Sequence, residues 1–385
     1  MATLNVKIAD ASFIKNKQQK LSFWLSFFIA HFLLIKRIKF HMKKVINCCT
    51  VILSSIIGVG FVSGQELLVF FARFGLFGCV CSIFAGVLFG LAVAYFLYKP
   101  PKLASKTNFK KPQNLLKTSE KRYQNDKNIK ISAIFNKVLL VAYVVISAAM
   151  ISGFRALLLS FMPALFVEVI LFLMLGLLFV LLIKELKFVQ SISKIFMFLF
   201  AIIFILLFAV NIDELSVKFN PNVNMIFVLC QIAFYVSMNV FTSMPIIISY
   251  GKNFSKKECV VVGIVCGVLC GVFILMGSLV LSGKTFESEI PLLELVNFNV
   301  LKIVYVLVVF VGLVTTLFST VLGAVTLCGG AIKHYVLVLY FSYILSSFGF
   351  SGIVGRMYPL VGFFSMLALI IMFLMVKSAK FDNCV

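Results

Sequence analysis

Apolar runs of about 20 residues recur along almost the whole chain, separated by short polar segments. A helix rises about 1.5 Å per residue, so a run of this length crosses the roughly 30 Å of hydrocarbon in a bilayer. The chain is 62% apolar and 12% charged, whereas a soluble domain is about 45–50% apolar and 25% charged. The sequence therefore predicts an all-α integral membrane protein in contact with the lipid bilayer.

The apolar runs define ten expected transmembrane helices. We place them at residues 44–71, 76–98, 134–159, 163–183, 188–210, 224–250, 259–282, 300–328, 334–350 and 356–376. They form one domain over residues 42–378, followed by a short tail over residues 379–385. The N-terminal extension, residues 1–41, contains an apolar stretch that is too short for a comfortable span. We expect this extension to be dispensable, with translation starting at Met42.

Basic residues predict the orientation of these helices. Lysines are dense in the loop over residues 99–130 and recur in every second connection, which places both chain termini in the cytoplasm. This loop is polar and is expected to be a flexible linker at the anionic inner leaflet, or a docking segment. The net charge of +22 is distributed between apolar runs rather than on one polar face, so no nucleic-acid partner is expected.

A break in the first helix is the strongest functional signal. Gly58 and Gly60 interrupt an apolar run that continues past Ser63, Gln65 and Glu66. An interruption at membrane depth exposes backbone groups that lipid cannot satisfy, so it occurs only where it lines a protein cavity. A second interruption is expected in the sixth helix at Pro245, just after Asn239, Thr242 and Ser243.

Two broken helices, the first and the sixth, begin the two halves of a five-plus-five inverted repeat, which is typical of secondary transporters. The alternative for the sixth helix is a simple proline kink whose freed groups are satisfied by neighbouring helices.

The sequence resembles the YkvI-like bacterial membrane proteins. Met42, Lys43 and Lys44 lead into GVGFVSGQE at residues 58–66, which is followed by a Phe-rich run and Arg-Phe-Gly at residues 73–75. The resemblance continues through Tyr235, Ser237 and Asn239 and through the pair Thr315 and Thr316. It implies a LeuT-like fold of the amino acid/polyamine/organocation superfamily and a location in the bacterial inner membrane. It implies no particular cargo.

The expected substrate site surrounds both breaks. Its residues are Gly58, Gly60, Ser63, Gln65, Glu66, Tyr235, Asn239 and Ser243. In LeuT-like folds a hydroxyl pair on the eighth helix holds sodium beside carbonyls of the first helix, and the resemblance assigns these roles to Thr316, Ser319 and the carbonyl near Val59. The alternative is that these hydroxyls bond their own helix one turn back.

Three charged residues inside apolar runs have competing interpretations. Glu66 is either a cap of the second half of the first helix or a substrate or proton site. Arg155 either snorkels to the membrane surface or serves a gate or substrate carboxylate. Lys194 either snorkels or, as the resemblance implies for some superfamily members, replaces sodium and makes transport proton-driven.

These features predict a secondary transporter of a small polar solute, an amino acid or an amine, that works by alternating access with sodium as the coupling ion. The alternative is a non-transporting membrane scaffold or sensor with the same fold. An enzyme is not expected, because the spans contain no HExxH, Gly-x-Ser-x-Gly or paired intramembrane aspartates. The cysteines lack the paired spacing of a zinc site, so no cofactor other than Na⁺ is expected, and the oligomeric state is left open.

Overall fold

The structure is a computed structural model that describes residues 42–100, 126–183, 188–217, 219, 223–251, 254–296 and 299–381. The chain divides into two units, Met1–Cys48 and Cys49–Val385. In the first unit only residues 42–48 are described, and they are helical. The extension 1–41, most of the basic loop 99–130 and the last four residues of the tail lie outside the described residues.

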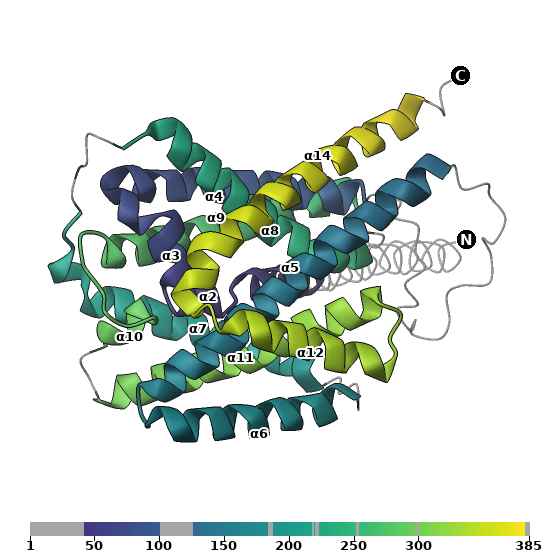
Figure 1. The fold of residues 1–385 in the computed structure, drawn as a ribbon. Coiled ribbons are helices and arrows are strands. Elements are labelled where there is room, and N and C mark those ends of the chain that lie inside the picture. The colour runs from purple at the N-terminus through teal and green to yellow at the C-terminus, as the bar shows by residue number, and fades with distance from the viewer. Residues whose placement is uncertain are drawn as a thin grey trace, which may run out of the picture. The chain divides into compact units, whose positions relative to one another are not determined.

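The second unit is all-helical over its described residues, with no strand among them (Figure 1). After helical residues 49–56 its elements are α2 (Val59–Val62), α3 (Gln65–Phe70), α4 (Gly75–Tyr98), α5 (Asp126–Leu159), α6 (Ala164–Ile183), α7 (Phe188–Val210), α8 (Met225–Gly251), α9 (Lys256–Leu281), α10 (Pro291–Glu294), α11 (Asn299–Leu327), α12 (Ile332–Ser346), α13 (Phe350–Gly352) and α14 (Tyr358–Phe381). Short 3₁₀ turns at Ala72–Phe74 and Ile212–Glu214 and a π-helical turn at Ile353–Met357 join some of them.

Seven spans of the described chain are long and apolar enough to cross a membrane. They are Gln65–Tyr98, Ala133–Leu159, Ala164–Leu182, Met225–Gly251, Lys256–Leu281, Asn299–Leu327 and Phe350–Leu374, and shorter apolar helices lie at Phe196–Val210 and Ile332–Ser346. Large apolar side chains such as Leu91 and Leu165 are exposed on these helices, as lipid contact requires. The prediction of a multi-pass helical membrane protein is therefore confirmed, whereas ten full-length spans are not.

The α4 and α9 helices share the most extensive helix–helix contact of the second unit (Figure 1). Their contact is made of glycines, because a Cβ atom on Gly86 would lie 2.6 Å from the Gly267 carbonyl oxygen and one on Gly263 would lie 2.5 Å from that of Gly90. Small residues allow this approach of two backbones in membrane proteins, where packing rather than the hydrophobic effect drives helix association. The flanking side chains border an outward-facing apolar groove of about 530 Å³.

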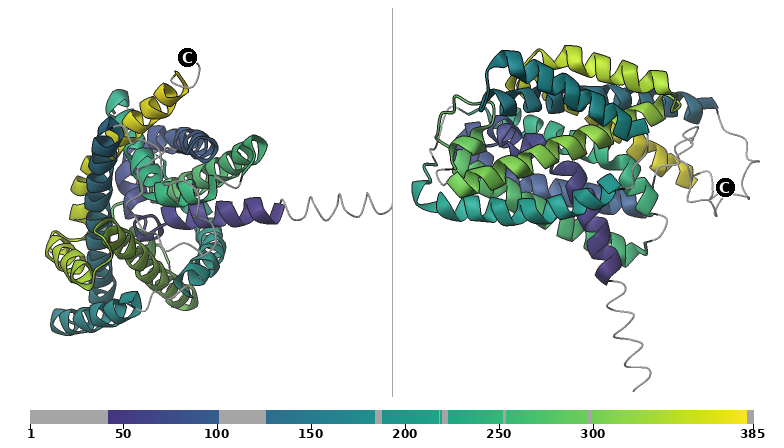
Figure 2. Two further views of the ribbon diagram at one scale, coloured as in Figure 1. Left: turned by 90° about the vertical axis from the view of Figure 1, so that its right-hand side faces the viewer. Right: turned by 90° about the horizontal axis from the view of Figure 1, so that it is seen from below.

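A second set of helices packs around α5, which lies beside both α11 and α12 (Figures 1 and 2). The α6 helix follows α5 directly and lies next to it, while α8 packs against α14 and α4. The core between these helices is rich in aromatic rings, including the fully buried Phe154, Phe200 and Phe241. Phe61, which follows the first break, packs its ring 5.9 Å from that of Phe200 in α7.

Several connections meet at one end of the second unit. The hydroxyl of Ser216, after α7, donates to the Ser282 carbonyl after α9 at 3.4 Å. Ser160, after α5, and Ser288, before α10, line a common hollow of about 160 Å³. The connections that follow α5, α7 and α9 thus lie together, as alternate connections of a serpentine membrane chain must.

Cysteine labelling tests the orientation predicted from the lysines. In a background without native cysteines, Glu287→Cys lies in the α9–α11 connection and Lys333→Cys lies at the start of α12, after the next crossing. We expect an impermeant maleimide to label Glu287→Cys in intact cells and to label Lys333→Cys only after permeabilisation. The opposite pattern would invert the topology.

Candidate functional site

The first interruption is present where the sequence predicts it. Helical residues end at Ile56, Gly58 is non-helical, α2 follows, and a second interruption at Ser63 and Gly64 precedes α3. Gly64 has φ of 85°, a left-handed conformation that favours glycine. The Ser63 hydroxyl donates to the Gly60 carbonyl at 3.0 Å and accepts from the Gln65 amide at 3.2 Å, which stabilises the turn into α3.

Neighbouring elements satisfy carbonyls that this interruption frees. The Tyr305 hydroxyl of α11 donates to the Val62 carbonyl, and the Leu292 amide of α10 donates to the Ser63 carbonyl at 3.0 Å. The broken segment is thus held by protein on two sides, as non-helical backbone at membrane depth must be. The α10 helix covers it from the end at which the α5, α7 and α9 connections meet.

The predicted interruption of the sixth helix is wrong. The α8 helix is assigned as continuous from Met225 to Gly251, with Pro245 inside it. Polar side chains near the proline bond carbonyls of the preceding turns: the Thr242 hydroxyl donates to the Met238 carbonyl at 2.9 Å, and the Asn239 amide donates to that of Tyr235 at 2.9 Å. The Tyr143 hydroxyl of α5 donates to the Thr242 carbonyl at 3.1 Å. The alternative, a proline accommodated by neighbouring groups, describes α8 better.

Several predicted site residues from distant segments meet around the first interruption. The Ser55 and Ser243 hydroxyls are 2.8 Å apart and link the residues before the break to α8. The Gln65 amide nitrogen donates to the Ser351 hydroxyl of α13 at 3.0 Å. Asn239 is 6% exposed, and its side-chain amide donates to the Tyr235 carbonyl of its own helix. Ser55 and Ser351 were not predicted as site residues, because neither forms part of a recognisable spacing pattern with Gly58 and Gly60.

The expected sodium ligands are partly assembled. A Cβ atom on Gly58 would lie 3.6 Å from the Thr316 hydroxyl oxygen, so Thr316 faces the first break. The Ser319 hydroxyl is exposed and donates to the Thr315 carbonyl of its own helix at 2.8 Å. The alternative of own-helix bonding therefore holds for Ser319, as it does for Thr315 and Thr320. Val59 is the first residue of α2, and the Lys194 side chain in α7 lies outside the described part.

Glu66 lies deep in the protein, in the first turn of α3. It is 5% exposed, and a Cβ atom on Gly60 would lie 1.9 Å from its Oε1 atom, so the carboxyl rests directly on the Gly60 backbone. No hydrogen bond joins this carboxyl to the amides at the start of α3 in the described structure. The capping interpretation of Glu66 is therefore not supported by its geometry.

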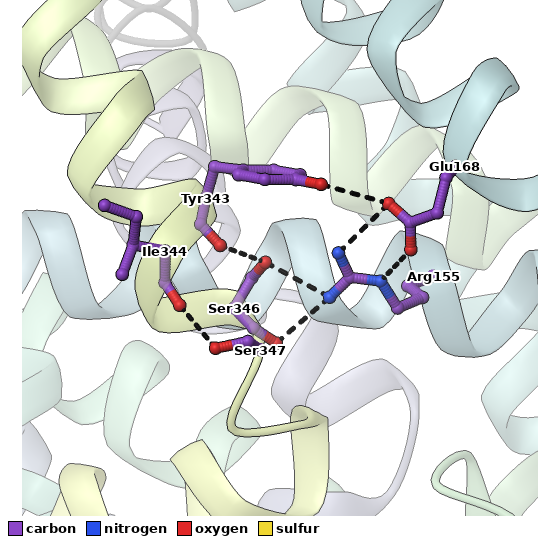
Figure 3. Close-up of polar contacts among 6 residues, drawn as sticks. All are labelled: Arg155, Glu168, Tyr343, Ile344, Ser346 and Ser347. Carbon is purple, nitrogen blue, oxygen red and sulfur yellow. Dashed lines mark hydrogen bonds and ion pairs between the residues drawn. The ribbon is translucent and has the colours of Figure 1, made fainter.

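Arg155 forms a half-buried ion pair with Glu168 (Figure 3). Its Nε atom donates to Glu168 Oε1 of α6 at 2.7 Å, and its Nη1 atom donates to the Ser346 carbonyl at the end of α12 at 3.2 Å. The Tyr343 hydroxyl donates to Glu168 Oε2 at 3.2 Å. The sequence offered a signal for this pair, since Arg155 and Glu168 interrupt adjacent apolar helices on either side of Pro163.

A double-mutant cycle measures this ion pair. Arg155→Ala and Glu168→Ala should each lower the thermal stability of the purified protein, and their combined effect should be smaller than the sum by a coupling energy of about 1 kcal/mol. The coupling is small because the side chains are 21% and 42% exposed, so that solvent screens their attraction. Tyr343→Phe, which removes one hydrogen bond, should have a smaller effect. Additive single effects would contradict the pairing.

No protein-family model matches this chain, and no curated protein matches it significantly. The resemblance to the YkvI-like proteins therefore stays a prediction from the motif residues.

Proposed function

We propose that the protein is a secondary transporter of a small polar solute, an amino acid or an amine, in the bacterial inner membrane with both termini in the cytoplasm. The main support for the proposal is the interruption between Ile56 and Gln65. It lies among helices that are long and apolar enough to cross a membrane, and polar side chains line it. Such breaks supply half-helix ends and carbonyls that bind solutes and ions at the midplane of transporters.

The helix contacts support a five-plus-five inverted repeat of the LeuT type. In such a repeat α4 corresponds to α9, α5 to α11, α6 to α12 and α7 to α14, while the first broken helix corresponds to α8. Contacts should then recur between corresponding helices. Four of them do, whereas the extensive α8–α14 contact is matched only by ring contacts of Phe61 with α7. The contact of α4 with α8 corresponds to that of α9 with α3, and the contact of α5 with α12 corresponds to that of α11 with α6. Likewise the contact of α5 with α6 corresponds to that of α11 with α12, and the contact of α7 with α11 corresponds to that of α14 with α5. The continuous α8 departs from this symmetry, because its broken counterpart is the first helix.

Within this proposal the solute binds beside the first break. Gly58, Ser63 and Gln65 contribute from the break itself, and Asn239 and Ser243 contribute from α8. Sodium binds between Thr316 and the carbonyls near Val59, and Ser319 joins as a ligand only if its hydroxyl leaves the Thr315 carbonyl that it bonds in this structure. The placement of Thr316 against Gly58 supports this division, since freed carbonyls and hydroxyl oxygens suit a hard cation.

A thermal-shift screen tests the proposal. The purified protein is heated with amino acids, amines or small acids, each with and without sodium. A ligand at about 100 times its dissociation constant stabilises the folded state by about 2.7 kcal/mol, so a true substrate class should raise Tm measurably. If no compound raises Tm in either condition, the non-transporting scaffold or sensor becomes the better interpretation.

Sodium coupling is tested by removing hydroxyls from α11. We expect ligand-induced stabilisation or uptake to rise with sodium in the wild type and to lose this dependence in Thr316→Ala with Ser319→Ala. The matched control is Thr326→Ala, because the Thr326 hydroxyl bonds the Gly323 carbonyl of the same helix two to three turns further on. Activity that ignores sodium but is abolished by Lys194→Ala would instead favour the lysine-based alternative.

A further inference from the structure

Glu66 is 5% exposed, and it is the one acidic side chain in the buried class among those whose burial the structure describes. Its Oε1 atom lies against Gly60, and its Oε2 atom is enclosed without a hydrogen-bond partner. The Tyr235 hydroxyl of α8 lies near the carboxyl and is also enclosed without a hydrogen bond. Two polar groups are therefore buried side by side with unused hydrogen-bonding capacity.

Among the described residues, the surroundings of Glu66 offer no positive charge that would neutralise a carboxylate. The titratable groups that act on it are Tyr235 of α8, Cys270 of α9 and Tyr358 of α14, and all three are at most 2% exposed. No basic side chain of the described structure pairs with this carboxyl, and Arg73 and Arg356 are both exposed. An ionised carboxylate without a partner is far costlier to bury than a neutral acid.

The packing also limits what can bind to this carboxyl. The Phe70 and Phe71 rings lie 5.1 and 5.2 Å from the Tyr235 ring and close the site on that side. A metal cation requires several oxygen ligands, whereas this pocket offers phenols, a thiol and rings around a single carboxyl. A proton requires no ligand shell and adds no volume.

We propose that Glu66 is a proton-carrying site: a neutral acid while α2 and α3 enclose it, and a carboxylate once movement of these helices admits water. On opening, the O–H bond of the acid breaks and a water molecule takes the proton. On closing, the carboxylate recovers a proton before burial. This inference rests on the proposed transport function and adds a proton at Gly60 to the sodium ion proposed at Gly58, where Thr316 lies.

A third buried oxygen supports the location. Gln231 lies one turn before Tyr235 on the same face of α8, is 8% exposed, and its Oε1 atom also lacks a hydrogen-bond partner. The unpaired oxygens of Glu66, Tyr235 and Gln231 would gain partners when water enters along this face. Intramembrane carboxyls in proton-driven pumps and transporters are arranged in such polar series.

Infrared spectroscopy of the full-length protein in lipid vesicles tests the proton site directly. We expect the carbonyl band of a neutral carboxylic acid at neutral pH in the wild type and its loss in Glu66→Gln. Glu287→Gln, which removes an exposed carboxyl from the α9–α11 connection, should retain the band. Identical spectra of the wild type and Glu66→Gln would overturn the proposal.

A second variant covers the case in which Glu66→Gln does not fold. Tyr235→Phe removes a hydroxyl beside the acid and lowers the polarity around its carbonyl group, so the band should persist at a shifted frequency. An unshifted band in this variant would show that the neutral acid is not Glu66.

Uptake by proteoliposomes then tests whether the proton is carried. With a radiolabelled amino-acid mixture and no sodium gradient, an inside-alkaline gradient should raise wild-type uptake several-fold and should have no effect on Glu66→Gln. Wild-type uptake that ignores the gradient would overturn the carrying role. Absence of uptake under any gradient would count against the proposed transport function, while the infrared band would still decide whether Glu66 binds a proton.

Discussion

Gly267→Ala is expected to destabilise the protein strongly, by about 3 kcal/mol, which is the upper part of the usual cost of overpacking. Its Cβ atom would lie 2.7 Å from the Gly86 carbonyl oxygen and 2.9 Å from the Gly90 α carbon. Both are backbone atoms and cannot turn aside, so α4 and α9 must separate along their glycine contact. Thermal unfolding of the purified variant in lipid nanodiscs measures the loss.

The control is a glycine-to-alanine substitution at a position where the added methyl group meets no neighbouring atom. Gly176 lies within α6, and no atom lies within 4 Å of a Cβ atom placed there. Gly176→Ala should be neutral or slightly stabilising, because alanine favours the helix by roughly 0.5–1 kcal/mol over glycine. Equal Tm values for the two variants would show that α4 and α9 do not pack through their backbones.

Gly60→Ala is expected to abolish transport and to lower the yield of folded protein. The added carbon would lie 1.9 Å from Glu66 Oε1 and 2.5 Å from its carboxyl carbon. Although the carboxyl is the end of a flexible side chain, its burial leaves it no nearby space, so the α2–α3 segment must deform. Size-exclusion profiles report the folded yield, and uptake by proteoliposomes reports transport.

A compensating substitution shows whether Gly60→Ala acts through collision of the added carbon with the Glu66 carboxyl. In Gly60→Ala with Glu66→Ala the carboxyl is gone, so most of the lost stability and yield should return. Transport should stay absent, because the buried acid is missing. Failure of the double variant to recover would mean that Gly60 is required for the backbone rather than for the carboxyl.

The helical framework is readable from the sequence because it depends on local composition. The expected boundaries at residues 76–98 and 188–210 agree with α4 and α7 to within a residue at each end. Apolar length and intervening polar segments suffice for this, since a membrane helix satisfies its backbone within itself. The same rule does not fix the length of each crossing, and α12 ends at Ser346, shorter than expected.

The two predicted breaks had different outcomes for a physical reason. Gly58 and Gly60 lack a Cβ atom and allow both the turn at Gly58 and the approach of the Glu66 carboxyl. Pro245 removes only one donor, and the Thr242 and Asn239 side chains bond carbonyls nearby. Whether a proline breaks a helix depends on such neighbours, which a sequence pattern does not reveal.

Partnerships across helices were only partly readable from the sequence. Arg155 could be singled out as a charge in an apolar run, but its partner depends on how α5, α6 and α12 pack. The isolation of Glu66 likewise depends on Tyr235, Cys270 and Tyr358, which come from three later helices. One sequence contains these residues without indicating that they converge.

Hydrogen exchange at the Leu292 amide, which donates to the Ser63 carbonyl, reports the opening of the broken helix. This amide proton is sheltered only while α10 rests on the turn before α3, and separation of the two segments exposes it to solvent. The rate at which this proton exchanges with deuterium therefore reports how often the broken segment is uncovered. A bound solute that favours the covered state would slow this exchange, so one backbone proton reports occupancy without a label at the site itself.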